Sequence, residues 1–525
     1  MKWKVLPKKS DDLVEQLLIN RGIKTKKERE DFFNPKISDY EKDLNIPGIK
    51  KAQERIKRAI KKNELIIVYG DYDVDGICAC AILYKGLTSL GAKVLPYIPH
   101  REKEGYGLSK IGLEFAKSSG ATLVITVDNG IVAIEQAKYA KSIDLDLIIT
   151  DHHVPLEKLP DAYEIVHSTK MCGAAVAWCL IKEVISKELA KELMQFVCLA
   201  TVCDLMPLLN LNRAFVYEGL KILNQTTNPG LLALTHESGI SLGSIGSFEI
   251  GYVIGPRINA IGRLEHAIDA LRLLCTKDEN KAKKLAKLLH ETNIKRQIMT
   301  MDAYEEAKLM VDESKSIHVL SSKNWVPGLI GLIAGKAAEE YLRPSIAISI
   351  GEIVSKGSAR SVDGINIVEV IREFEDILID VGGHPGAAGF SIETRHIEVF
   401  KTKIEKYNFD YEQGEQVLGI DAEVKCDQLT KDMVESLQKF QPFGFKNPRP
   451  ILATYGMQVS DIRTVGQGKH LKFKADNIDV IAFGMGELEK TLSNGQSVDL
   501  AYTPEIDTYN GNDKLQLKVK DIKLL

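Results

Sequence analysis

The sequence predicts an α/β protein with a parallel-sheet domain, a second α/β domain joined to it by a long helix, and a small C-terminal β-barrel. Three observations predict this fold class. Short apolar runs alternate with helical patterns in the first part of the chain, an alternation typical of parallel β-α-β units. A long charged helical pattern follows from about 277 to 313. Beyond about residue 416, short alternating runs are separated by Gly, Asn and Asp, as in small barrels.

The length of 525 residues is too great for one hydrophobic core, and we expect several domains. In chain order we expect a helical lead-in at 1–50, an α/β domain with a helical part at 51–275, a connecting helix at 276–315, a second α/β domain at 316–412, and a barrel at 413–525. The pattern at 276–315 is also compatible with an ordinary surface helix of a bundle.

Composition excludes several classes of protein. With 44% hydrophobic and 27% charged residues, the chain is typical of a soluble globular protein. No stretch approaches the roughly 20 apolar residues that a membrane helix needs, and the N-terminus has no apolar core typical of a secretory signal. The 8 cysteines are scattered without a C-x-x-C pair, which favours reduced thiols and a cytoplasmic location.

The net charge of −3 argues against a uniformly basic surface for nucleic acid. Residues 1–62 nevertheless hold 18 Lys and Arg against 10 Asp and Glu, and a basic helix is expected at Lys51–Lys62. Two interpretations remain open for this excess: a solvated helical face, or a surface that faces phosphates.

Acidic and imidazole groups follow three expected strands of the first α/β domain. The strands are expected at Leu65–Tyr69, Leu123–Val127 and Leu145–Thr150, with a mainly helical segment at 173–225. The groups that follow them are Asp71, Asp73 and Asp75, then Asp128, then Asp151, His152 and His153. Since ligands bind at the carboxyl edge of a parallel sheet, we expect these groups to converge there.

Such convergence predicts a metal centre. Carboxylates a few Å apart repel each other, and divalent cations remove that conflict. Oxygen ligands with an imidazole suit Mn²⁺ or Mg²⁺, and the number of carboxylates fits two ions roughly 3.5–4 Å apart. Such a pair stabilises the charge of a phosphoryl transition state.

Each of these acidic motifs, taken alone, has a simpler interpretation than a metal site. The first triplet could be a calcium loop, but Ile82 stands where an EF-hand needs Glu. Asp128-Asn129-Gly130 could be a turn, and the Asp151 triplet could cap a helix. Asp204, after the apolar run Phe196–Val202, could likewise be a cap. The occurrence of three acidic groups after three successive strands favours the metal centre.

These residues resemble the DHH phosphoesterase superfamily, and the resemblance covers nearly the whole chain. The motifs are similar to those of its RecJ branch, in the family's order: VYGDYDVDG (68–76), VDNGI (127–131), TDHHVP (150–155), TVCDLMPL (201–208), GPRINAIGRL (255–264), KGSARS (356–361), GGHPGAAGF (382–390) and QPFGFKNPRPIL (441–452). The resemblance therefore implies a DHH domain, a DHHA1 domain and an OB-like barrel.

The resemblance also implies residue roles. The metal ligands would be Asp73, Asp75, Asp128, His152 and Asp204, with Asp71 as a less certain sixth. His153 would face the scissile phosphate or brace the ligand imidazole, Asp128 would be essential for catalysis, and Asp151 would orient the two histidines. Substrate contacts would come from Ser358, Arg360 and Arg101 at a terminal 5′-phosphate, from Arg257 and Arg263 along the DNA, and from His384 in a glycine-rich stretch.

The sequence departs from the family pattern in two motifs. Tyr69 stands where many relatives carry His, so the first metal site is expected to be weaker or to recruit Asp71. In the barrel motif, Gln441 replaces the usual Glu and Lys446 the usual Gly. Candidate stacking residues of the barrel are Phe440, Phe443, Phe445 and Phe473, each of which could instead belong to its core.

The expected function is therefore that of a single-strand-specific 5′→3′ exonuclease that acts in DNA repair and recombination. It would hydrolyse DNA with two divalent cations, Mn²⁺ or Mg²⁺, and release 5′-mononucleotides. Expected partners are single-stranded DNA and, by family, single-strand-binding protein and a helicase. The alternative is a phosphodiesterase of the same superfamily that acts on short oligonucleotides or cyclic dinucleotides, although the C-terminal barrel favours long strands. A non-catalytic scaffold would not need the metal carboxylates, and an inorganic pyrophosphatase would not need the barrel.

Overall fold

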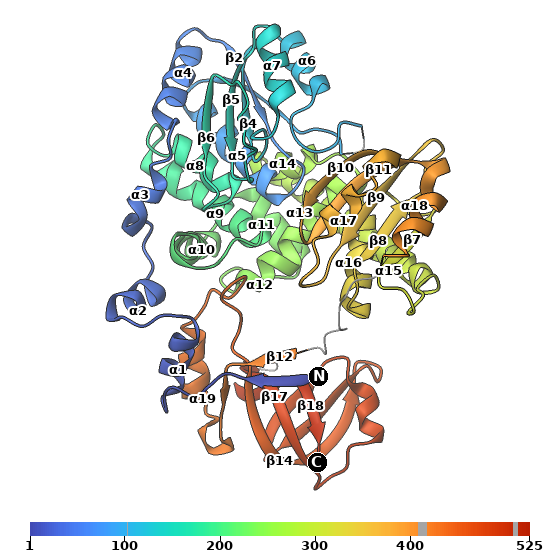
Figure 1. Cartoon of the computed structure of the whole chain (residues 1–525). Coiled ribbons are helices and arrows are strands. Elements are labelled where there is room, and N and C mark those ends of the chain that lie inside the picture. The colour runs from blue at the N-terminus through green and yellow to red at the C-terminus, as the bar shows by residue number, and fades with distance from the viewer. Residues whose placement is uncertain (102, 408–416, 508–512) are drawn as a thin grey trace. The chain divides into compact units, whose positions relative to one another are not determined.

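The chain folds into two compact units. This computed structural model describes all residues except 102, 408–416 and 508–512. The larger unit comprises Tyr40–Met206 and Glu218–Gly414 (Figure 1). The smaller unit comprises Met1–Asp39, Pro207–Tyr217 and Glu415–Leu525. Three separate stretches of sequence thus share one compact unit, a grouping that the division expected from the sequence does not anticipate.

A five-stranded parallel sheet is the centre of the first part of the larger unit. Its order is β3-β2-β4-β5-β6, and every neighbouring pair is parallel. The strands are β2 (Leu65–Tyr69), β3 (Lys93–Tyr97), β4 (Ala121–Val127), β5 (Asp146–Asp151) and β6 (Glu164–His167). Because the order reverses between β2 and β4, the carboxyl ends of these two strands form a topological switch point, where doubly wound sheets bind ligands.

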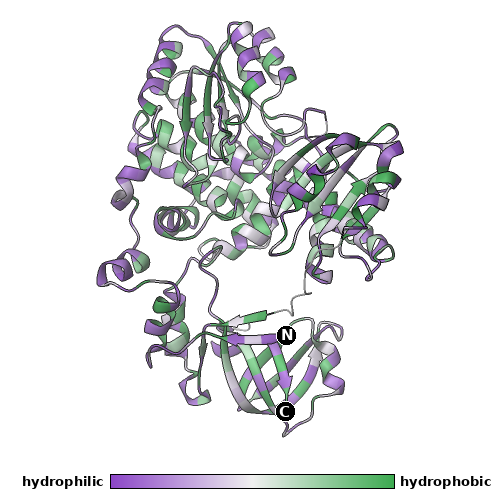
Figure 2. Ribbon diagram, in the orientation of Figure 1, coloured by the Kyte–Doolittle hydropathy of each residue, from purple (hydrophilic) through white to green (hydrophobic). Residues whose placement is uncertain are grey.

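Helices surround this sheet and extend beyond it. The helices are α3 (Glu41–Leu44), α4 (Ile49–Lys61), α5 (Val74–Ser89), α6 (Lys110–Ser118), α7 (Ile134–Ser142), α8 (Gly173–Ile181), α9 (Lys187–Cys203), α11 (Pro229–Glu237), α12 (Ser247–Glu249), α13 (Gly255–Leu264) and α14 (Ile268–Cys275). The helix α10 (Asn210–Leu223) begins in the smaller unit and ends in the larger one. A π-helical turn, Ile250–Ile254, joins α12 to α13. Hydrophobic residues run along the strands, while hydrophilic residues mark the outer faces of the helices (Figure 2).

The 30-residue helix α15 (Glu279–Lys308) leads into a second five-stranded sheet. The sheet has the order β10-β11-β9-β8-β7, and only the pair β7–β8 is parallel. Its elements are β7 (His318–Ser322), α16 (Ile330–Tyr341), β8 (Ser345–Ser349), β9 (Val354–Arg360), α17 (Ile367–Arg372), β10 (Leu378–His384), β11 (Ala387–Glu393) and α18 (Ile397–Ile404). The fold expected from the sequence, two α/β domains joined by a long helix, is confirmed.

The smaller unit is built on a closed barrel. Its sheet runs β13-β14-β15-β16-β18-β17, and an additional pairing of β14 with β17 closes it. The elements are β1 (Lys2–Val5), α1 (Leu13–Asn20), α2 (Lys26–Phe33), β12 (Val417–Ile420), β13 (Ala422–Glu423), α19 (Lys431–Gln438), β14 (Leu452–Val465), β15 (His470–Ala475), β16 (Ile478–Ala482), β17 (Ser497–Asp507) and β18 (Lys514–Leu524). The expected OB-like barrel is confirmed.

One expectation for this unit is corrected. The first residues are not helical: β1 is a strand because Lys2 pairs in parallel with Val417, a partner that local sequence cannot reveal. Of the two interpretations left open for the phenylalanines, burial supports the barrel core for Phe440 and Phe473, whereas Phe445 is 50% exposed. In the described part of the chain, no helix combines the length and the apolar character that a bilayer crossing requires.

Candidate active site

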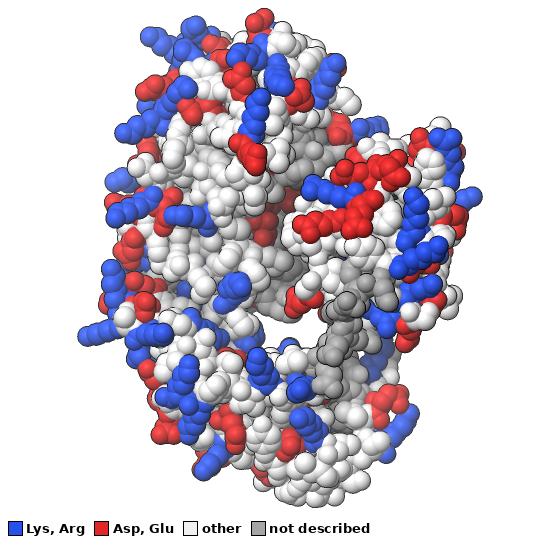
Figure 3. All heavy atoms as spheres, in the orientation of Figure 1, with Lys and Arg blue, Asp and Glu red and all other residues white. Residues whose placement is uncertain are grey.

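The acidic groups gather at the switch point of the first sheet. Asp71 follows β2, Asp128 follows β4, and Asp151 is the last residue of β5. Asp71, Asp128 and Asp151 are all at most 2% exposed, which is unusual for carboxylates. Figure 3 shows acidic side chains inside a hollow of the larger unit, whose outer surface carries many lysines and arginines. The predicted convergence is therefore observed.

Asp73 begins α5 and fixes the first acidic loop. Its Oδ1 accepts a hydrogen bond of 3.0 Å from the Gly76 N–H, so Asp73 is the N-cap of the helix. A Cβ atom on Gly76 would lie 2.6 Å from the backbone nitrogen of Asp71. Only glycine fits at this position, and the tight loop brings Asp71 and Asp73 to the same edge.

Asp75 is held by the N-terminus of α8. Its two carboxylate oxygens accept hydrogen bonds of 2.7 Å from the Gly173 and Ala174 N–H groups. The positive end of a helix dipole stabilises such a carboxylate. A Cβ atom on Gly173 would lie 2.6 Å from the Asp128 Cβ and 2.7 Å from its Oδ1, so α8 can approach the cluster only with glycine here. Sequence reasoning missed Gly173 because its partner Asp75 is 98 residues away.

Backbone strain is found at two points of the cluster. Asp128 has φ 63°, and Leu205, which follows Asp204, has φ 53°. Residues other than glycine adopt this left-handed region at an energetic cost, and such strain concentrates at functional sites. One strained residue, Asp128, is an acid of the cluster, and the other, Leu205, directly follows the acid Asp204.

Potential ligand atoms form three overlapping groups. Within each group the atoms lie within 4.8 Å of one another: Asp71, Asp73 and Asp128; Asp75, His152 and Asp204; and Asp128, His152 and His153. Asp128 occurs in two groups, as expected of a carboxylate that bridges two ions. His152 Nε2 lies 3.1 Å from Asp128 Oδ1 and 3.6 Å from an oxygen of each of Asp75 and Asp204.

Buried atoms of this cluster have no hydrogen-bond partner among the described residues. They are Asp71 Oδ1, Asp128 Oδ1 and His152 Nε2. Asp128 Oδ1 and His152 Nε2 are only 3.1 Å apart, yet the two atoms do not form a hydrogen bond with each other. Buried polar atoms are normally satisfied, so atoms left open in this way fit a site for cations. The donor set of carboxylates and one imidazole suits Mn²⁺ or Mg²⁺.

Burial and mutual repulsion shift the pKa values of the groups in this cluster. Burial and the charge of neighbouring carboxylates raise the pKa of Asp71 and of Asp128 well above the usual range. Burial and the charge of Asp73 raise the pKa of Asp75 to about 7, and burial with the charge of Asp75 raises the pKa of Asp204 to about 8. Burial lowers the pKa of His152 to about 4, which leaves a neutral imidazole that can bind a cation.

Asp151 orients the histidine that follows the candidate ligand His152. Its Oδ1 lies 2.8 Å from His153 Nδ1 and accepts from the backbone N–H of His152 at 2.7 Å. Burial lowers the pKa of His153, but the hydrogen bond to Asp151 and the charges of the neighbouring carboxylates together outweigh burial, and the pKa is raised overall. For Asp151 burial raises the pKa, and the hydrogen bonds from His153 and Ile131 together with the charge of His153 outweigh it and lower the pKa. Both shifts favour the form of the pair with a carboxylate and an imidazolium.

Arginines border the acidic cluster on one side. Burial of Arg263, together with the charges of Arg101, Arg296 and Arg360, lowers its pKa to about 10. Arg360 Nη1 donates to Ser358 Oγ at 3.1 Å, and the Arg101 guanidinium lies 4.6 Å from the centre of the Tyr72 ring. Cations that repel one another in this way are suited to binding an anion.

Two predicted substrate residues lie apart from this arginine group. Arg257 Nε donates to His290 Nδ1 at 3.2 Å, and its Nη1 donates to the carbonyl of Val253 at 2.7 Å. His384 is exposed in the turn between β10 and β11, where its Nδ1 accepts from the Gly386 N–H. Neither contact involves the acidic cluster.

Sequence reasoning missed two side chains near the cluster. The Tyr106 hydroxyl lies 3.1 Å from His153 Nε2 and 3.2 Å from the carbonyl oxygen of Asp128. Arg296, on α15, joins the repelling arginines. The glycines on either side of Tyr106 were a possible signal, since both have φ 81° and form a sharp loop. Arg296 carried no local signal within a charged helix.

Tyr69 is directed away from the cluster. Its hydroxyl lies 3.2 Å from the carbonyl oxygen of Gly107 and from Ser109 Oγ, and burial raises its pKa to about 12. A neutral phenol with these partners is no ligand, whereas Asp71 has an open buried oxygen.

Three family models match the chain in order. The model described as "DHH family, N-terminal domain" matches residues 65–201, "DHHA1 domain" matches 314–408, and "RecJ OB domain" matches 420–521. The single-stranded-DNA-specific exonuclease RecJ of Bacillus subtilis is 34% identical over 531 residues, covering 97% of this chain and 67% of the relative. This chain belongs to the RecJ family. The RecJ of Haemophilus influenzae is 30% identical over 522 residues, covering 91% of this chain and 90% of the relative.

Solved structures of RecJ agree with this assignment. A crystal structure of RecJ from Thermus thermophilus in complex with Mn²⁺ has a TM-score of 0.87 and 28% identity, covering 99% of this chain and 79% of that chain. A structure of the same protein in complex with Mg²⁺ has a TM-score of 0.80 and 27% identity, covering 99% and 78%. The RecJ architecture therefore extends over the whole length of this chain.

Proposed function

We propose that this RecJ-family chain is a metal-dependent exonuclease that degrades single-stranded DNA in the 5′→3′ direction and releases 5′-mononucleotides, in DNA repair and recombination. The observation that carries the proposal is the buried cluster of carboxylates and one imidazole, with open ligand atoms on Asp71, Asp128 and His152, beside a group of arginines whose charges repel one another. The chemistry of such a site is hydrolysis of a phosphodiester.

The cofactors are divalent cations, Mn²⁺ or Mg²⁺, and we assign two of them. Their ligands would be Asp71, Asp73, Asp75, Asp128, His152 and Asp204, with Asp128 shared. When bound, the cations supply an activated water and stabilise negative charge on the phosphoryl group. The protein contributes a neutral His152 and an Asp75 clamped by α8, so that the ligand positions are fixed before substrate arrives.

His153 is assigned the role of a hydrogen-bond donor to the substrate. Asp151 holds Nδ1, and Nε2 would exchange its 3.1 Å contact with the Tyr106 hydroxyl for a hydrogen bond to a non-bridging oxygen of the scissile phosphate. Until then the Tyr106 hydroxyl limits the positions that the ring can take.

The arginine group is assigned the role of setting the direction of digestion. Arg101, Ser358 and Arg360 would receive the terminal 5′-phosphate, and Arg263, whose pKa responds to the charges of Arg101, Arg360 and Asp73, would assist them. A strand held by its 5′-phosphate would present its first internal phosphodiester to the metal centre. Arg257 and His384, whose hydrogen bonds involve none of these residues, are assigned to the strand further from that end.

Digestion of end-labelled single strands tests the proposal. Strands with and without a 5′-phosphate are compared with duplexes in Mn²⁺, in Mg²⁺ and in chelator, with Asp128→Ala as the inactive variant. Release of labelled 5′-mononucleotides from the 5′ end, and only with cation, is the expected result. Full activity of Asp128→Ala would contradict the site assignment. A rate on a dinucleotide far above that on a long strand would favour the alternative, a phosphodiesterase of short or cyclic oligonucleotides.

The proposal also covers the partners of the chain, its location in the cell and its domain boundaries. We infer from the family that single-strand-binding protein and a helicase act with this chain. A cytoplasmic location is supported by its eight free cysteines, five of which are buried, as expected in a reducing compartment. The boundaries 51–275, 316–412 and 413–525 are proposed for the DHH, DHHA1 and OB-like domains, with the lead-in 1–50 and the connecting helix 276–315.

A further inference from the structure

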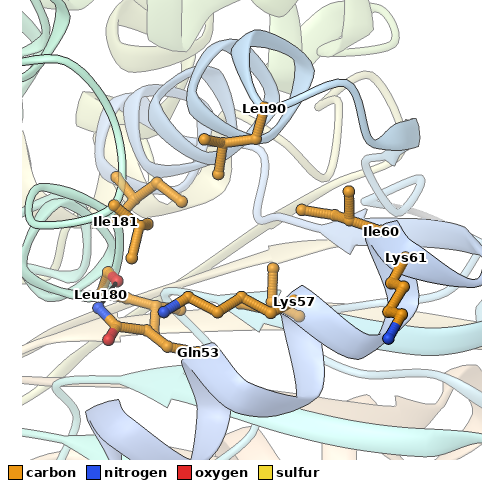
Figure 4. Close-up of a pocket in the computed structure, with 9 residues that line it drawn as sticks. Gln53, Lys57, Ile60, Lys61, Leu90, Leu180 and Ile181 are labelled. Atoms are coloured by element: carbon orange, nitrogen blue, oxygen red, sulfur yellow. Dashed lines mark hydrogen bonds between the residues drawn. The ribbon is translucent and has the colours of Figure 1, made fainter.

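An apolar pocket of about 290 Å³ opens between α4, the end of α5 and the end of α8 (Figure 4). Ile56, Leu180 and Ile181 are buried at its floor, while Ile60 and Leu90 are partly exposed. The remaining lining residues are Gln53, Lys57, Lys61 and Val184. Apolar surface that stays in contact with water in a folded protein commonly marks an interaction site.

The pocket is remote from the candidate metal centre. Lys61 ends α4 just before β2 begins, and Leu90 ends α5 just before β3 begins, so the pocket lies where the parallel strands start. The acids lie at the opposite edge, where the strands end. Asp73 caps the first turn of α5, and Leu90 caps the last turn of this 16-residue helix, which spans about 24 Å. The pocket is therefore no part of the catalytic site.

The walls of the pocket are firmly held. Gln53 Nε2 donates to the carbonyl oxygen of Leu180 at 2.8 Å, which ties α4 to the end of α8. A Cβ atom on Gly86 would lie 2.8 Å from Ile181 Cγ1, so α5 and α8 pack in close contact. A pocket with fixed walls binds without a large entropic cost of ordering.

Unpaired cations flank the apolar lining. Lys57 and Lys61 are exposed and lie one helical turn apart on α4, and neither forms an ion pair with any residue that the structure describes. Figure 4 shows both side chains among the apolar residues of the pocket. Their helix belongs to the basic N-terminal stretch of the sequence, and its one acid, Glu54, does not line the pocket.

We propose that this pocket docks an acidic segment of a partner protein, with an apolar side chain in the pocket and carboxylates on Lys57 and Lys61. Charge complementarity selects an acidic partner, and the lining selects an aliphatic or aromatic anchor. A nucleic acid fits less well, because the pocket offers no aromatic ring for base stacking and no arginine fork for phosphate. The basic excess of the N-terminal residues would thus serve protein recognition.

A displayed library of random peptides, selected on the full-length chain, tests the proposal. We expect enriched peptides to combine several Asp or Glu with one large apolar residue, and their affinity to fall as salt rises. Synthetic copies are then measured by fluorescence polarisation on the wild type and on variants. Lys57→Glu/Lys61→Glu and Ile60→Asp should each weaken binding by at least about tenfold. Lys283→Glu/Lys287→Glu reverses two exposed lysines of α15 at the same spacing and should leave binding unchanged.

Nuclease activity on a short oligonucleotide provides the folding control for all three variants and should remain at the wild-type level. Two results would overturn the proposal: a library that yields no acidic peptide, or peptides that bind the pocket variants as tightly as the wild type. A loss of single-strand affinity in Lys57→Glu/Lys61→Glu would instead assign the surface to nucleic acid, and would equally overturn it.

Discussion

Neutralising Asp204 tests whether the acidic cluster is a set of repelling carboxylates that cations stabilise. Burial and the charge of Asp75 raise the pKa of Asp204 to about 8, and burial and the charge of Asp73 raise the pKa of Asp75 to about 7. A carboxyl whose pKa is raised on folding stabilises the folded state by holding its proton. That stabilisation is complete below the unfolded pKa of 3.8 and is lost progressively as pH rises to the folded pKa, which is about 7 for Asp75 and about 8 for Asp204.

The magnitude follows from the structure. For Asp75, the change of pKa from 3.8 to about 7 corresponds to roughly 4 kcal/mol of stability that the cation-free protein loses by pH 9. A cation at about 100 times its dissociation constant restores about 2.7 kcal/mol, or roughly 5 °C in Tm. The Mn²⁺-induced rise in Tm should therefore grow from pH 6 to pH 9.

Asp204→Asn removes one repelling charge and one ligand. In chelator at pH 8 we expect its Tm to exceed that of the wild type, and with Mn²⁺ we expect a smaller rise than in the wild type. Thermal unfolding followed by fluorescence, with chelator or Mn²⁺ across this pH range, measures both. Asp161→Asn, at an exposed carboxylate paired with Lys141, is the matched control and should change neither. The reasoning would be refuted by a Tm that does not change with pH in chelator and does not rise when Mn²⁺ is added.

Three further substitutions probe the site. Gly173→Ala would force a methyl group to within 2.7 Å of Asp128, so we expect a loss of at least about 2 kcal/mol in stability and of most activity, measured by unfolding and digestion. Arg360→Ala should abolish the preference for a 5′-phosphorylated strand, seen as a raised KM for that substrate only; an unchanged preference would exclude it from the end pocket. Tyr106→Phe removes the hydroxyl beside His153 and should lower kcat about tenfold at constant KM, whereas a raised KM at unchanged kcat would indicate a binding role.

The sequence by itself determined the strands and the acids that follow them. Leu65–Tyr69 is a run of apolar residues whose length and flanks specify a buried strand, and Asp71 follows it by chain connectivity. Parallel strands share a carboxyl edge, so Asp71, Asp128 and Asp151 had to meet once the sheet formed. The resemblance of the motifs to a known family added which of these groups bind cations, and those ligand assignments stay predictions.

Only the tertiary structure decided which groups touch across long sequence distances. Asp75 is clamped by Gly173, β1 pairs with β12, and Arg296 joins arginines of three other segments. Arg257 bonds to His290 and to the carbonyl of Val253, contacts that its motif did not indicate, and its role along the DNA stays a prediction. Local periodicity carries no signal for such contacts, because they depend on how whole elements pack and not on the residues within one element. The assignment of Phe473 to the barrel core likewise depended on its burial in the tertiary structure.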